Sequence, residues 1–178
     1  MDGCKLVIIS GIDGSFVEFN DSIERFLVCR NILKISYARF LTFVQNVEVM
    51  KYKIEQQKEN CIIVGWSIGA VASAFLAECS NVKSIIMINP FFSRSEILTR
   101  RHIYCDEEVN IFSTTKQSVK YTIIAGRLDD KIPYEESKKI VNYYNLGSDC
   151  FVLFPDARHN LNTFPERKIA NIINCHIV

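Results

Sequence analysis

Gly65-Trp66-Ser67-Ile68-Gly69 is the stretch of sequence that decides the fold. The run before it, 61–64, is short, apolar and β-branched, and it predicts a buried strand. The run after it, 70–77, is Ala-rich and predicts a helix packed on a sheet. Gly-x-Ser-x-Gly between a strand and a helix is typical of a sharp turn that presents a Ser hydroxyl as a nucleophile. The alternative is a plain strand-to-helix turn that carries no chemistry.

Apolar runs alternate with segments of helical character along the rest of the chain. We expect strands at 6–9, 32–37, 61–64, 82–88, 121–125 and 150–154, and helices at 19–30, 40–57, 70–77, 135–144 and 165–173. This alternation predicts an α/β fold in which about six strands form a mostly parallel, doubly wound sheet. We expect residues 1–178 to form a single domain, with 91–119 as a reduced cap over the strand ends.

Composition excludes several classes of protein. A net charge of +1 argues against general nucleic-acid binding, which favours a basic excess. No stretch approaches the roughly 20 apolar residues of a membrane span, and we expect no signal peptide. The seven Cys lack a Cys-x-x-Cys pair, so we expect reduced, buried thiols in a cytoplasmic protein, with neither zinc nor a disulfide framework.

A Ser nucleophile needs a general base, and the chain has three His. His102 lies in the irregular segment beside two Arg, and His176 lies near the C-terminus, where we expect a surface group. His159 directly follows the strand expected at 150–154. Because parallel strands place their functional loops at their carboxyl ends, His159 is expected on the same edge as Ser67. The alternative is a loop His with no role.

The base in turn needs a carboxylate to orient it. Two adjacent candidates, Asp129 and Asp130, follow the strand expected at 121–125. Their place after a strand puts either one at the edge of the sheet expected to carry Ser67 and His159.

The order Ser, acid, His along the chain resembles that of the α/β-hydrolase superfamily. Members commonly carry Gly-x-x-Asp-x-x-(Val/Ile)-Pro at the acid, and Gly126, Asp129, Ile132 and Pro133 match that spacing. The resemblance therefore implies Asp129, rather than Asp130, as the acid of a Ser67–His159–Asp129 triad. No metal or organic cofactor is implied.

The same resemblance implies an oxyanion hole made of two backbone N–H groups. One belongs to Ile68, directly after the nucleophile, and the other to Ile12 in the loop 10–15 after the first strand. Ser10 stands where the family usually has His or Pro. The alternative, a nucleotide-binding domain, is disfavoured because this loop lacks both Gly-x-Gly-x-x-Gly and the Walker Lys.

Gly-Trp-Ser-x-Gly is similar to the sharp turn that carries the nucleophile, called the elbow, in pimeloyl-acyl-carrier-protein methyl ester esterases, which complete pimelate synthesis for biotin. This likeness implies a small-molecule or carrier-bound acyl ester as substrate, with an acyl carrier protein docking at Arg94, Arg100 and Arg101. A plain carboxylesterase or thioesterase is the broader expectation, and the three Arg are then a solvated face. A non-catalytic binding protein of the same fold is the alternative from another class.

Overall fold

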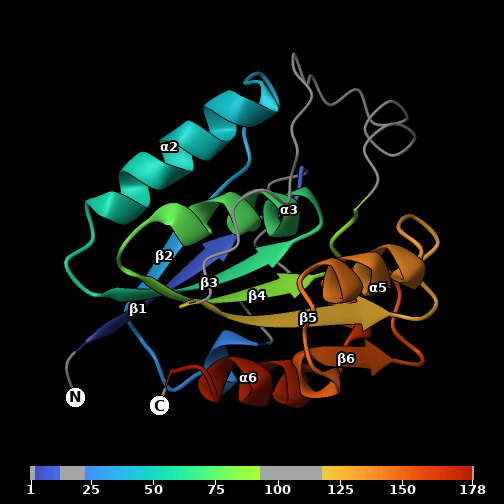
Figure 1. The fold of residues 1–178 in the computed structure, drawn as a ribbon. Coiled ribbons are helices and arrows are strands. Elements are labelled where there is room, and N and C mark those ends of the chain that lie inside the picture. Colours follow the sequence, from blue (N-terminus) through green and yellow to red (C-terminus); the bar gives the residue numbers. More distant parts are fainter. Residues whose placement is uncertain (1–2, 13–22, 93–117, 178) are drawn as a thin grey trace.

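A computed structural model describes residues 3–12, 23–92 and 118–177 of the chain (Figure 1). Its strands are β1 (Cys4–Ile9), β2 (Ile32–Ile35), β3 (Asn60–Trp66), β4 (Val82–Ile88), β5 (Lys120–Gly126) and β6 (Phe151–Phe154). They form one six-stranded sheet in the order β2-β1-β3-β4-β5-β6. Every neighbouring pair among these strands is parallel. The α/β fold with about six strands is therefore confirmed.

The strand order reverses between β1 and β3. The chain passes from β1 outward to β2 on one side, and from β3 outward to β6 on the other. Strands β1 and β3 are paired in register from Cys4 opposite Asn60 to Ile9 opposite Gly65, so they end together. Crevices at such reversal points bind ligands in open α/β sheets. Ser67 lies just past the end of β3, at this position.

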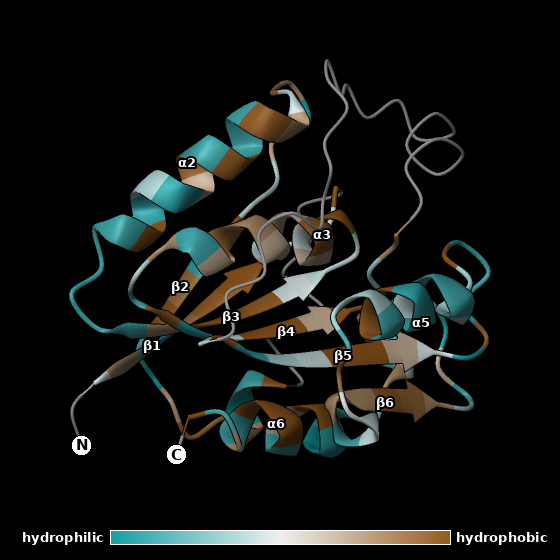
Figure 2. Cartoon of the chain, in the orientation of Figure 1, coloured by the Kyte–Doolittle hydropathy of each residue, from teal (hydrophilic) through white to brown (hydrophobic). Residues whose placement is uncertain are grey.

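Helices cover both faces of the sheet (Figure 1). One face carries α2 (Phe43–Glu55), α3 (Ile68–Phe75) and α5 (Tyr134–Tyr143), and the other carries α6 (Glu166–Asn174) and the 3₁₀ turn η1 (Glu24–Phe26). Further 3₁₀ turns are η2 (Leu76–Glu78), η3 (Ser148–Cys150) and η4 (Leu161–Thr163). Figure 2 shows the mainly apolar strands between helices that carry both polar and apolar residues, except α3, which is mainly apolar and buried.

Alternate residues of each strand serve the two cores. Val7 and Ile9 of β1 pack with the helices of the first face, whereas Leu6 and Ile8 pack with the opposite layer. Both sets are buried. A strand buried on both faces explains the continuous apolar runs in the sequence.

Helix α2 begins later than the expected 40–57 because Thr42 caps it. The Thr42 hydroxyl accepts a hydrogen bond from the Gln45 N–H at 3.2 Å, and the Gln45 side chain accepts one from the Thr42 N–H at 2.9 Å. This capping box satisfies two backbone donors at the start of the helix.

The helix expected at 19–30 is wrong in its described part, 23–30. The chain there forms the short turn η1 and becomes extended from Leu27. The side chain of Asn174 explains the change: its amide donates to the Phe26 carbonyl, and its carbonyl accepts from the Val28 N–H, each at 3.0 Å. A partner distant in the sequence thus takes backbone groups that a continuing helix would use.

The expectation that His176 is a surface group is also wrong. Helix α6 ends at Asn174, and the next turn folds the half-buried imidazole of His176 onto the amino ends of β4 and β5. There its Nε2 lies 3.0 Å from the Thr122 hydroxyl, and its Nδ1 contacts the Ser84 hydroxyl. Burial, with a smaller effect of nearby Lys120, lowers the pKa of His176 to about 4.

The described cysteines are all free thiols, but they are not all buried as expected. Cys29, Cys61 and Cys79 are buried, Cys4 and Cys150 are half-buried, and Cys175 is exposed; Cys105 lies outside the described residues. Burial raises the pKa of the Cys61 thiol to about 11, which leaves it protonated and unreactive at neutral pH.

Most of the segment expected to form a cap, 91–119, lies outside the described residues. Within the described ranges, no helix has both the length and the apolar character needed to cross a lipid bilayer.

Candidate active site

Ser67 occupies a strained turn between β3 and α3. Its φ of 56° and ψ of −123° are values that a residue with a side chain rarely adopts. The Ser67 N–H donates to the Ile88 carbonyl of β4 at 2.9 Å, which fixes the turn to the sheet. The first turn of α3 then closes on the Ser67 carbonyl, which accepts from Ala70 and Val71. Rigid elements on both sides therefore hold this conformation.

The two glycines of the motif are required by close backbone contacts. A Cβ at Gly65 would lie 2.5 Å from the carbonyl oxygen of Gly69, and a Cβ at Gly69 would lie 2.3 Å from that of Ser10. Both distances are far shorter than a carbon–oxygen contact tolerates. The sequence Gly-x-Ser-x-Gly is thus what allows the elbow, the start of α3 and the loop after β1 to meet.

His159 and Asp129 form a buried pair at the same edge of the sheet. His159 Nδ1 lies 2.8 Å from Asp129 Oδ2, and the two residues are 3% and 8% exposed. The other carboxylate oxygen accepts hydrogen bonds from the N–H groups of Lys131 and Ile132, both at 2.8 Å. The carboxylate is therefore fixed in orientation by its own loop. Asp130, its neighbour, is exposed.

The backbone of His159 is held from two other strands. Its carbonyl oxygen accepts from Trp66 Nε1 at 3.0 Å and from Asn89 Nδ2 at 3.1 Å. The rings of Trp66 and His159 are also in contact, with centroids 5.5 Å apart. Because Trp66 directly precedes Ser67, these contacts connect the imidazole to the elbow.

The structure brings Ser67 and His159 to one edge without a hydrogen bond between them. None of the hydrogen bonds among the described residues joins the Ser67 hydroxyl to the imidazole. Ser67 keeps 7% of its surface exposed. Contacts between a nucleophile and its base are often long before substrate binds.

Of the two amides expected to form the oxyanion hole, one belongs to the elbow itself and the other to the loop after β1. Ile68 is the first residue of α3, where N–H groups have no partner within the helix. The loop after β1 lies against the elbow, since a Cβ at Gly11 would be 3.5 Å from the Ser67 Cβ. Ile12 follows in this loop, and its carbonyl accepts from Arg39 Nε at 3.2 Å. Among the described hydrogen bonds, none uses the N–H of Ile12 or Ile68.

Ser10, which differs from the family pattern, has a structural explanation. Its side chain is buried, and its hydroxyl accepts a hydrogen bond from the Tyr37 N–H at 3.3 Å and donates one to the Gly11 carbonyl at 3.0 Å. The hydroxyl thereby ties the end of β1 to the chain that leaves β2.

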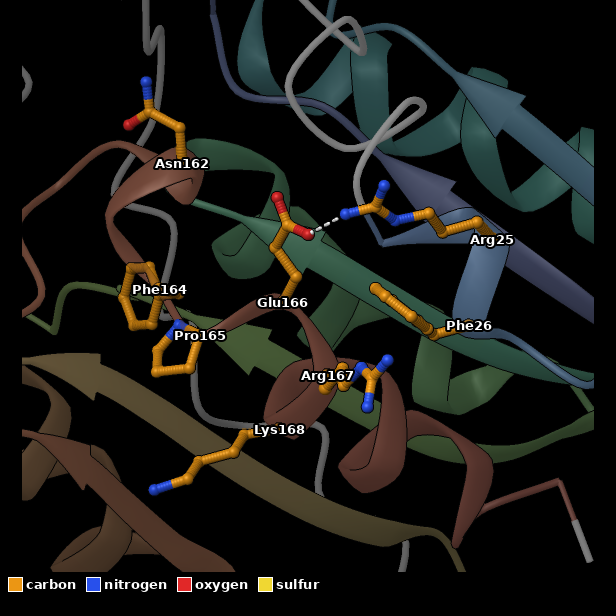
Figure 3. A pocket seen from close by; sticks show the side chains of 8 residues that line it. All are labelled: Arg25, Phe26, Asn162, Phe164, Pro165, Glu166, Arg167 and Lys168. Carbon is orange, nitrogen blue, oxygen red and sulfur yellow. Dashed lines mark hydrogen bonds and ion pairs between the residues drawn. The ribbon is translucent and has the colours of Figure 1, made fainter.

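An open hollow of about 800 Å³ lies beside α6 (Figure 3). Its lining residues are Arg25, Phe26, Asn162, Phe164, Pro165, Glu166, Arg167 and Lys168. Arg25 and Glu166 form an ion pair at 2.6 Å across it, as Figure 3 shows. The guanidinium groups of Arg25 and Arg167 lie 4.7 Å and 5.0 Å from the centre of the Phe26 ring. The hollow includes none of Ser67, Asp129 and His159.

The segments that continue from β1 and β4, 13–22 and 93–117, lie outside the described residues. Arg94, Arg100, Arg101 and His102 are among them. In the part of the chain that is described, no group of three or more His, Cys, Asp or Glu side chains is placed to hold a metal ion.

Asn89 is a residue that sequence reasoning missed. It follows β4, has a φ of 48°, and is 2% exposed. The sequence signal for it was the Asn-Pro pair that ends the strand, which indicates a turn but not a contact with the loop of His159.

Comparisons by sequence give no relative: no family model and no curated protein matches the chain. Comparison of the fold, in contrast, finds many similar solved structures. An esterase domain from Rhodothermus marinus superposes with a TM-score of 0.69 at 14% identity, covering 96% of this chain and 84% of its own. The ydeN gene product of B. subtilis superposes with a TM-score of 0.69 at 16% identity, and the match covers 97% of each chain. A monoacylglycerol lipase from Paleococcus ferrophilus superposes with a TM-score of 0.70 at 12% identity, and the match covers 97% of this chain and 94% of the lipase. The chain therefore has the α/β-hydrolase fold.

Proposed function

We propose that this protein is a serine hydrolase that cleaves a carboxylic ester or thioester. The observation that carries the proposal is the buried His159–Asp129 pair, which lies at the sheet edge where Ser67 occupies a strained elbow. The esterase and lipase names of the similar structures support the same reaction class. Fold alone does not fix function, so the proposal rests on the side chains.

The proposed reaction begins with attack of Ser67 Oγ on the carbonyl carbon of the substrate. His159 Nε2 accepts the hydroxyl proton, because Asp129 holds a proton on the opposite nitrogen, Nδ1. Collapse of the tetrahedral intermediate breaks the bond to the alcohol or thiol, which leaves with the proton from His159. Water then attacks the acyl-Ser67 ester in the same way, and the acid is released.

The N–H groups of Ile12 and Ile68 would stabilise the negative oxygen of each tetrahedral intermediate. Donors fixed by a β1 loop and a helix start need little rearrangement during the reaction. Loss of one such donor typically lowers turnover about 10²–10³-fold.

The narrower function, hydrolysis of a pimeloyl-acyl-carrier-protein methyl ester, rests on the Gly-Trp-Ser-x-Gly elbow and on Arg94, Arg100 and Arg101. The three Arg lie outside the described residues, so carrier docking and the cap at 91–119 stay predictions, as does a cytoplasmic location. A carrier-bound acyl ester hydrolysed faster than the corresponding small ester, with the difference reduced by salt, would support docking.

A fluorophosphonate probe tests the proposed function directly, because it reacts with an activated Ser. We expect labelling of the wild-type protein and of Ser80→Ala, a control at an exposed serine, and no labelling of Ser67→Ala. Equal labelling of wild type and Ser67→Ala would show that another residue is the nucleophile. No labelling of the wild type, with the fold intact, would favour the non-catalytic binding protein.

A further inference from the structure

We infer that Asn89 is a positioning residue that sets the place of His159 relative to both Ser67 and Asp129. The inference rests on the proposed function and adds to it a residue outside the triad and the oxyanion hole. It is drawn from the contacts that the buried amide of Asn89 makes at the end of β4.

All of the hydrogen bonds of this amide go to the backbone of the two loops that carry His159 and Asp129. Asn89 Oδ1 accepts from the Gly126 N–H at 2.9 Å, at the end of β5, where the acid loop begins. Asn89 Nδ2 donates to the carbonyls of Arg158 and His159, both at 3.1 Å. One side chain therefore joins the starting point of the acid loop to the backbone of the base.

The pattern of donors and acceptors around position 89 requires an Asn side chain. Only an amide combines an acceptor toward Gly126 with a donor group toward two carbonyls, and its reversed orientation would oppose like groups at every contact. The left-handed φ of 48° further favours Asn over a residue with a larger side chain. An Asp of the same size has no hydrogen to donate and would place an anionic oxygen against the carbonyls of Arg158 and His159.

Gly126 brings these groups close enough to share one side chain. A Cβ there would lie 2.5 Å from the Ala157 carbonyl and 2.8 Å from that of Arg158. The loop of His159 therefore lies directly against the end of β5. Trp66 supplies the second donor to the His159 carbonyl from β3. The base, which follows β6, thus takes its position from the ends of β3, β4 and β5.

The test compares Asn89→Asp and Asn89→Gly with Asn81→Asp. Glycine keeps the left-handed backbone, so it separates loss of the side chain from backbone strain. Asn81 is a matched control at the opposite edge of the sheet, where its Nδ2 also donates to two carbonyls, those of Ile54 at 2.8 Å and Gln57 at 3.1 Å. Urea unfolding of each variant establishes that it is folded under the assay conditions.

We expect both Asn89 variants to lower kcat for a small p-nitrophenyl ester about 10²-fold with KM unchanged, because displacement of a catalytic group by about 1 Å has an effect of that size. Asn81→Asp should retain kcat within about 2-fold. A kcat for Asn89→Asp and Asn89→Gly equal to that of the Asn81 control would overturn the inference.

A spectroscopic readout separates this inference from the proposed function. With ¹⁵N-labelled His, the Nδ1 proton that His159 shares with Asp129 should give a resonance protected from exchange in the wild type and in Asn81→Asp. The resonance should be lost in both Asn89 variants. Its persistence there would refute a positioning role even in a protein that failed to react with fluorophosphonate, and its loss would support the role whether or not Ser67 proves to be the nucleophile.

Discussion

Replacing Asp129 by Asn changes one group of the site while leaving the shape of the loop. The N–H groups of Lys131 and Ile132 both donate to Oδ1, so the new amide must keep its oxygen on that side and present its NH₂ to His159. The opposite orientation leaves two buried donors without an acceptor, at a cost of roughly 1–3 kcal/mol each. At least about 2 kcal/mol therefore separates the orientations, and a few per cent of molecules at most adopt the active one.

The favoured orientation places a donor against His159 Nδ1, so this nitrogen becomes the acceptor and Nε2 carries the proton. An imidazole in that tautomer cannot accept a proton from Ser67. The corresponding change in a serine protease lowers turnover about 10⁴-fold, which equals about 5.4 kcal/mol of transition-state stabilisation. The preference for the inactive orientation alone accounts for at least about 30-fold, and losing the negative charge that stabilises the imidazolium adds to it. We therefore expect a total loss of at least about 10³-fold in kcat/KM here, with stability within about 1 kcal/mol of wild type because the loop bonds remain.

The assay is hydrolysis of a p-nitrophenyl ester, together with the rate of fluorophosphonate labelling and a urea unfolding curve. Asp130→Asn is the matched control, since Asp130 is adjacent and exposed, and it should have wild-type activity. A loss of less than 10-fold for Asp129→Asn, or an equal loss for Asp130→Asn, would refute the reasoning from the hydrogen bonds of Asp129.

Two further predictions concern packing and pH. Gly69→Ala should abolish activity and lower the free energy of unfolding, measured by urea titration, by about 1–3 kcal/mol, because its Cβ would lie 2.3 Å from the Ser10 carbonyl. The control Gly3→Ala, whose Cβ would have its nearest contact at 3.7 Å, should change neither activity nor stability. Because the folded state keeps His176 neutral, with a pKa of about 4 against an ordinary 6.5, the unfolded state binds the proton first as pH falls. Stability from this residue should thus be present above pH 6.5 and decrease toward pH 4, and His176→Gln should flatten that part of the stability–pH curve; an unchanged curve would contradict the burial of the ring.

The sequence by itself determined the sheet and the edge on which the candidate site lies. Continuous apolar runs such as 82–88 are strands buried on both faces, and a parallel sheet gathers the residues that follow its strands. Ser67, Asp129 and His159 could therefore be assigned to one edge before any coordinates. These signals are local: hydrophobic period, flanking Gly and spacing from a strand.

The tertiary structure alone decided the features that depend on partners distant in the chain. Asn174 ends the helical character of 23–30, His176 folds back onto β4 and β5, and Asn89 joins two loops that follow other strands. Periodicity cannot reveal such contacts, because one polar side chain satisfies backbone atoms up to 148 positions away and leaves no repeating pattern. A polar side chain binds the backbone donors and acceptors that the packed sheet leaves without partners, and only the folded chain shows which groups those are.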